Sequence, residues 1–167
     1  MIKKFSWLTV LFLILTISGR AEDVRMKDVF RLMPDSLFPT LSANNRLDMI
    51  DFMDSHMKAE VTNLLGGKSE MTALGDDSLT IRMSESLTVQ MLLLKPMEMV
   101  DSCSQVVCLI EQFGTDSLSL DTKIEFYTPQ WQKLDERPRL SESDAHRVSV
   151  LDTKTILNFM GTILKKD

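Results

Sequence analysis

The chain has 167 residues, 44% of them hydrophobic and 26% charged, which is enough for one domain with a substantial core. Its 24 acidic residues outnumber its 19 basic residues, so the formal net charge at pH 7 is −5. An acidic surface repels phosphate backbones, and this charge therefore argues against a nucleic-acid partner.

The first 21 residues follow the order of a cleavable export signal. Lys3 and Lys4 precede an apolar run over residues 7–17, and Gly19 and Ala21 supply the small residues that a signal peptidase reads. The run is shorter than the roughly 20 residues of a spanning helix, and no cysteine near the cut is available for lipidation. We therefore expect a signal peptide over 1–21 and a single soluble domain over 22–167. The domain would be periplasmic or extracellular, without a retained membrane anchor. Cleavage removes three basic residues and no acid, which leaves 16 basic and 24 acidic residues and a net charge of −8.

Two helices are predicted before the first glycine pair. The first covers residues 22–33 and ends at Pro34, because proline cannot continue a helix. The second starts after Ser42, a good N-cap, and runs to about Lys58 with apolar residues at helical spacing. Gly66 and Gly67 then break the pattern.

The stretch over residues 69–127 alternates between apolar and polar residues, which predicts antiparallel strands. Turn signals occur at residues 75–78 and 113–117, and the continuous apolar run over 91–94 suits a strand that is covered on both faces. Residues 134–150 are polar and contain Pro138, and we expect a long surface connection there. A last amphipathic helix is predicted after Asp152, with its apolar stripe formed by Ile156, Leu157, Met160, Ile163 and Leu164. This order predicts an α+β fold, with an antiparallel sheet of about five strands and the N-terminal and C-terminal helices packed against one face of it.

The two cysteines, Cys103 and Cys108, lie five residues apart. Within one strand that spacing spans about 16 Å, whereas a disulfide needs Cα atoms less than about 7 Å apart. Buried free thiols are therefore favoured, although a bulge or turn between the two residues would still allow a bond.

Motifs that resemble catalytic or metal sites lack the context that their chemistry needs. The run Gly66-Gly-Lys-Ser69 has no glycine at the start of a phosphate-binding loop, and Ser55 with Lys58 lies at a helix end instead of a helix start. The aspartates at 48, 51 and 54 with His56 read as a solvated helix face, and the twelve methionines read mainly as core. We predict no enzyme activity, no metal and no cofactor.

Aromatic residues are concentrated at the end of the last predicted strand. Tyr127 and Trp131 follow Phe126 there, and Lys133 comes next. Such a group either seals the edge of the core or forms a recognition patch for a peptide or a glycan. We name Tyr127, Trp131 and Lys133 as the candidate binding residues.

Three stretches resemble a family of small exported Bacteroidetes proteins that is classed as a domain of unknown function. They are residues 33–42, residues 44–53 with 58–65, and residues 123–131. The resemblance implies an envelope location in a Gram-negative cell and carries no catalytic residues. We expect a non-catalytic binding or interaction module of the cell envelope, with an envelope protein, peptide or glycan as its partner. The alternative is a carrier of an apolar ligand, held in a cavity walled by Met49, Met53, Leu92 and Met160.

Overall fold

The computed structural model describes residues 23–115 and 118–151. The predicted export segment and the helix expected after Asp152, with Ile156 and Met160, lie outside the described residues. None of the helices within the described ranges is long and apolar enough to span a membrane.

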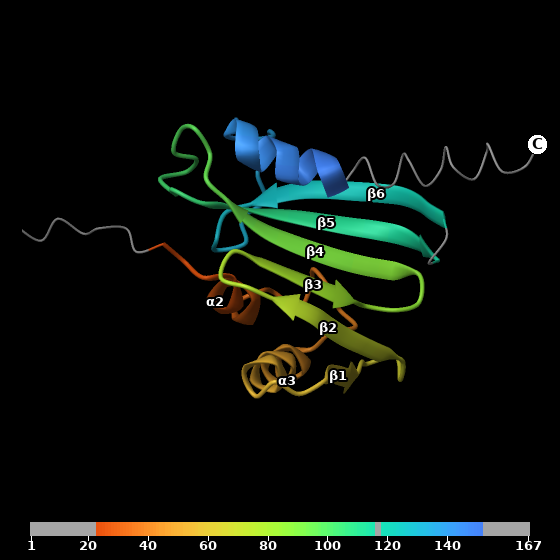
Figure 1. Cartoon of the computed structure of the whole chain (residues 1–167). Coiled ribbons are helices and arrows are strands. Elements are labelled where there is room, and N and C mark those ends of the chain that lie inside the picture. The colour runs from red at the N-terminus through yellow and green to blue at the C-terminus, as the bar shows by residue number, and fades with distance from the viewer. Residues whose placement is uncertain (1–22, 116–117, 152–167) are drawn as a thin grey trace, which may run out of the picture.

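Six antiparallel strands form one sheet in the order of the chain, which confirms the α+β class (Figure 1). They are β1 (Ala59–Thr62), β2 (Lys68–Leu74), β3 (Ser78–Arg82), β4 (Leu87–Leu94), β5 (Val106–Thr115) and β6 (Leu118–Tyr127). The predicted turn at residues 75–78 joins β2 to β3, with the Gly75 N–H donating to the Ser78 carbonyl at 2.8 Å.

The sixth strand, β1, is one that the sequence pattern did not reveal. The second helix, α3 (Ala43–Asp54), ends before Lys58, and Ser42 caps it together with Asn45. Beyond it, His56 has a left-handed backbone with φ 56°, and the Met57 N–H donates to the Phe52 carbonyl at 2.8 Å. A left-handed residue of this kind commonly ends a helix, and it is usually glycine. Here His56 takes that position, so the sequence contains no glycine that would mark the end of α3. The chain turns early enough for residues 59–62 to pair with β2.

The helices of the described residues lie on both faces of the sheet, whereas the expected packing of the C-terminal helix on the same face as the N-terminal helices falls on residues after Asp152, outside the described residues. In Figure 1, α2 (Met26–Arg31) and α3 lie on one side, and a helix over residues 142–151 lies on the other. The surface connection expected over 134–150 is therefore helical in its second half. Ser141 supplies the N-cap, accepting the Asp144 N–H at 3.2 Å, and Val148 is buried.

Two hydrophobic clusters follow from this layout. The main core contains Phe30, Met49, Met91, Leu93 and Tyr127, and the second core contains Leu92, Leu94, Cys108, Phe126 and Val148. Residues 91–94 of β4 alternate between the two, as expected for a strand covered on both faces. Met49 and Leu92 consequently belong to different cores and do not face one cavity, and Met160 is outside the described residues.

Both cysteines are free. Cys108 is buried in β5, and burial raises the pKa of its thiol to about 12, which keeps it protonated and unreactive. Cys103 is only half-buried and lies outside the strands, so the prediction of buried thiols is confirmed for Cys108 alone.

Candidate functional site

The residues predicted for binding, Tyr127, Trp131 and Lys133, come together at the end of β6. Tyr127 and Trp131 are buried, and their ring centroids are 5.6 Å apart with the planes at 54°. The indole Nε1–H of Trp131 donates to the Val29 carbonyl of α2 at 2.9 Å. Two of the three side chains therefore face the main core, and Lys133 alone extends into solvent. Their role in recognition stays a prediction.

Glu125 organises the charges at this strand end. Its carboxylate accepts hydrogen bonds from Lys133 at 2.6 Å and from the Tyr127 hydroxyl at 2.8 Å, and it forms an ion pair with Lys123 at 3.0 Å. The hydrogen bond from Lys133 is the largest influence on the pKa of Glu125, and with Tyr127 and Lys123 it lowers that pKa to about 2. Burial, with the bond to Glu125, raises the pKa of Tyr127 to about 12. The carboxylate of Glu125 thus links three neighbouring side chains at the strand end and is held in its charged form.

The low pKa of Glu125 predicts a specific loss of stability in acid. Because the carboxylate is favoured in the folded state, its contribution is present above the unfolded pKa of about 4.3 and is lost as the pH falls towards 2. We expect Glu125→Gln to lower stability at pH 6 and to flatten the decline between pH 5 and pH 2. Urea unfolding across that range measures both effects. Glu98→Gln, at an exposed carboxylate, is the matched control and should leave the decline unchanged. An equally steep decline in Glu125→Gln and the unaltered protein would contradict the assignment.

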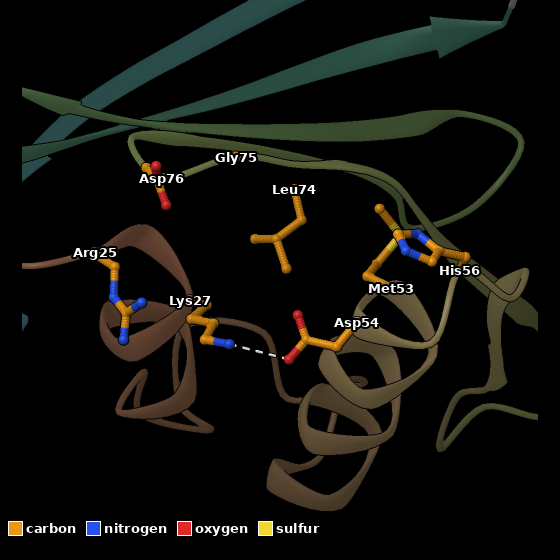
Figure 2. A pocket seen from close by; sticks show the side chains of 8 residues that line it. All are labelled: Arg25, Lys27, Met53, Asp54, His56, Leu74, Gly75 and Asp76. Atoms are coloured by element: carbon orange, nitrogen blue, oxygen red, sulfur yellow. Dashed lines mark hydrogen bonds and ion pairs between the residues drawn. The ribbon is translucent and has the colours of Figure 1, made fainter.

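A second feature is an open pocket of about 460 Å³ between α2, the end of α3 and the β2–β3 turn (Figure 2). We call it the α2–α3 pocket. It is lined by Arg25, Lys27, Met53, Asp54, His56, Leu74, Gly75 and Asp76.

The floor of the α2–α3 pocket is apolar. Leu74 points from the end of β2 towards the helices, and Met53 points from α3 beside it (Figure 2). Both side chains are half-buried and pack against the main core. The pocket is therefore a recess in the core surface where an aliphatic group can leave water.

The rim of the pocket carries charge of both signs. Lys27 and Asp54 join α2 to α3 through an ion pair of 3.0 Å. Asp76 points into the pocket from the β2–β3 turn, and its carboxylate has no hydrogen bond or ion pair with another described residue. Among the described residues, the one ion pair of Arg25 is with Asp28, at 3.5 Å on the surface. The rim thus presents one carboxylate and one guanidinium that are available to a ligand.

Local backbone structure determines where these groups lie. The first helix begins at Met26 and not near residue 22, because the segment before it is extended. The Val24 N–H donates to the side chain of the buried Gln105 at 2.7 Å, and the Met26 N–H donates to the Asp76 carbonyl at 2.7 Å. These bonds hold Arg25 beside Asp76.

Sequence reasoning did not find this pocket. Asp54 and His56, which the sequence pattern predicts on a solvated helix face with the other aspartates, line the pocket, and Asp54 is paired with Lys27. Across residues 23–115 and 118–151 no three acidic, histidine or cysteine side chains are arranged to hold a metal ion. The turn at 75–78 was recognisable, but its contact with the residues before α2 spans about 50 positions and leaves no local signal.

Comparison with known proteins assigns the chain to a family. The model of a family described as "Protein of unknown function (DUF3256)" matches residues 18–163. The chain belongs to the DUF3256 family. This confirms the resemblance to a family of unknown function, and export stays a prediction. The family description names no reaction, ligand or partner.

A solved structure supports the DUF3256 fold. It is described as a domain of an uncharacterized protein from Porphyromonas gingivalis W83, and it is 22% identical in sequence with a TM-score of 0.53. The match covers 70% of this chain and 59% of that chain. At 22% identity it supports the fold and carries no information on function. No curated protein matches the sequence.

Proposed function

We propose that this protein is a non-catalytic binding module of the cell envelope, and that its α2–α3 pocket binds an aliphatic primary amine. The export pattern of residues 1–21 supports the envelope location. The observation that supports the ligand class is the carboxylate of Asp76 above the apolar floor of Leu74 and Met53, since it has no hydrogen bond or ion pair within the described part of the chain. An ammonium group would pair with Asp76 while its hydrocarbon part covers the floor.

The chemistry of the pocket favours binding over catalysis. His56 is the one imidazole among its lining residues, and it makes no hydrogen bond with another described side chain that would orient it as a base. Asp54 is occupied by Lys27. A nucleophile with an adjacent base, the usual beginning of covalent catalysis, is not found among the lining residues.

A matched pair of small probes tests the proposal. Isopentylamine and isovalerate have the same hydrocarbon group and opposite charges. In a ¹⁵N-resolved NMR titration we expect isopentylamine, at about millimolar concentration, to shift the amide signals of Lys27, Met53, Gly75 and Asp76. Isovalerate should leave these signals in place.

Two variants locate the interaction. Asp76→Asn removes the carboxylate and should abolish the shifts caused by isopentylamine. Asp48→Asn makes the same change at an exposed position of α3 outside the pocket and should preserve them. Equal shifts with both probes, or undiminished shifts in Asp76→Asn, would refute an amine site at Asp76.

A further inference from the structure

A second open pocket, of about 520 Å³, lies directly beyond Arg25 and Asp76. We call it the Val24 pocket, because Val24 and Leu93 supply its apolar surface. Arg25 and Asp76 line both pockets and therefore form the wall between them. A ligand that crosses this wall has apolar surface on either side of it.

The wall is held in place by main-chain hydrogen bonds. The Met26 N–H donates to the Asp76 carbonyl at 2.7 Å, and the Leu93 N–H donates to the Asp77 carbonyl at 2.7 Å. On the other side, the Val24 N–H is bonded to Gln105 at 2.7 Å. These main-chain groups are occupied, so the wall offers a ligand the side chains of Arg25 and Asp76: a guanidinium group as hydrogen-bond donor and a carboxylate group as acceptor.

Apart from Arg25 and Asp76, which form the wall, the charged groups of the Val24 pocket are paired with one another. Lys95 contacts Asp23 at 2.6 Å, and Arg147 contacts Asp77 at 3.0 Å and Asp144 at 3.3 Å. A charged ligand group would have to displace one of these contacts, whereas an uncharged aliphatic group can cover Val24 and Leu93 without doing so. The Val24 pocket therefore favours an apolar side chain.

We propose that the amine bound in the α2–α3 pocket is the α-amino group of a peptide, and that the peptide continues across the wall into the Val24 pocket. This inference rests on the proposed function. The first side chain would cover Leu74 and Met53, the α-ammonium group would pair with Asp76, and the first peptide carbonyl would accept a hydrogen bond from Arg25. In an extended chain the first and third side chains point the same way and are separated by about 6.6 Å. The third side chain would then enter the Val24 pocket.

The recognised ligand is accordingly a free peptide N-terminus with aliphatic residues at positions one and three. The α-ammonium group distinguishes it from an internal peptide segment, which presents only an amide N–H to Asp76. A charge-assisted hydrogen bond is about twice as strong as a neutral one, so the free terminus is preferred.

Three probes separate this inference from the function on which it rests. They are isopentylamine, the tripeptide amide Leu-Gly-Leu with a free amino group, and the same tripeptide amide with an acetylated amino group. We expect the free tripeptide to bind about tenfold or more tightly than isopentylamine, because its third residue buries another leucine side chain. It should also shift the amide signals of Leu93, Lys95 and Gln105. Acetylation should weaken binding about tenfold.

The variant Val24→Ser removes apolar surface from the second pocket alone, and its main-chain bond to Gln105 remains available. It should reduce the affinity for the free tripeptide to that for isopentylamine and leave the affinity for isopentylamine unchanged.

A tripeptide that binds no better than isopentylamine overturns the inference and leaves the amine site standing. Equal binding of the acetylated tripeptide overturns recognition of a free N-terminus. Failure of isopentylamine itself to bind overturns both proposals.

Discussion

Replacing Arg46 by Met is expected to lower the free energy of unfolding by about 3–5 kcal/mol. Arg46 is on α3 and is only 2% exposed. Its guanidinium donates to the Met33 carbonyl at 2.6 Å, to the Leu41 carbonyl at 2.9 Å and to the Asp35 carboxylate at 2.7 Å. It therefore ties both ends of the proline-containing loop over residues 34–41 to α3.

The size of this effect comes mainly from the two carbonyl groups. Methionine fills much of the volume but donates nothing, and each buried carbonyl without a donor costs about 1–3 kcal/mol. The ion pair contributes less because the Asp35 side chain is 64% exposed, and exposed pairs are worth about 0–1 kcal/mol. Lysine would retain the charge, yet it lacks the planar fork that reaches three acceptors at once.

Urea unfolding followed by far-UV circular dichroism measures this difference. We expect Arg46→Met to be the least stable variant, Arg46→Lys to be intermediate, and Asp35→Asn to lie within about 1 kcal/mol of the unaltered protein. If Arg46→Met and Asp35→Asn lost the same small amount, the two backbone carbonyls would not depend on Arg46.

The second large effect is expected at Trp131, where substitution by Ala should cost about 3–5 kcal/mol. The indole ring is buried against Tyr127, and its Nε1–H bonds to Val29 over a sequence separation of 102 residues. Loss of the ring opens a cavity between the end of β6 and α2. Trp131 also has a left-handed backbone with φ 66°, an uncommon conformation for a bulky residue, and Thr128 steadies it by bonding to both Trp131 and Gln132.

The variant Trp131→Phe separates the contribution of the ring from that of the hydrogen bond. Phenylalanine retains most of the apolar burial and lacks the N–H. The Val29 carbonyl also accepts from the Leu32 N–H at 3.2 Å, so it keeps one donor. We expect Trp131→Phe to lose about 1–2 kcal/mol, well below the loss in Trp131→Ala. Thermal unfolding by circular dichroism, which does not depend on the indole, records both values. Near-equal losses in the two variants would show that the hydrogen bond dominates.

The strand region was largely predictable because a half-buried β-strand alternates apolar and polar residues, and this alternation is visible in a short stretch of sequence. Alternation placed β2 to β6, and the run Met91–Leu94 indicated a strand between two cores. Alternation along β6 also places the neighbouring side chains of Phe126 and Tyr127 in different cores. Two elements were not predicted from the sequence: β1, which follows the early end of α3, and the helix over residues 142–151. His56 ended α3 where a glycine would have been the visible signal, and the polar residues before Val148 concealed a helix with a narrow buried stripe.

The amino-acid sequence by itself determined the α+β class, the antiparallel sheet and the acidic charge of this protein, because periodicity and composition are local properties. The tertiary structure alone decided that helices cover both faces of the sheet and that Trp131 belongs to the core. It also decided that Arg25, Asp54 and Asp76 meet around one pocket. The arrangement of these three residues depends on the hydrogen bond from the Met26 N–H to the Asp76 carbonyl, and on the hydrogen bond from the Val24 N–H to the Gln105 side chain. Contacts across such separations depend on how packed elements satisfy their buried polar groups, and no short stretch of sequence encodes them.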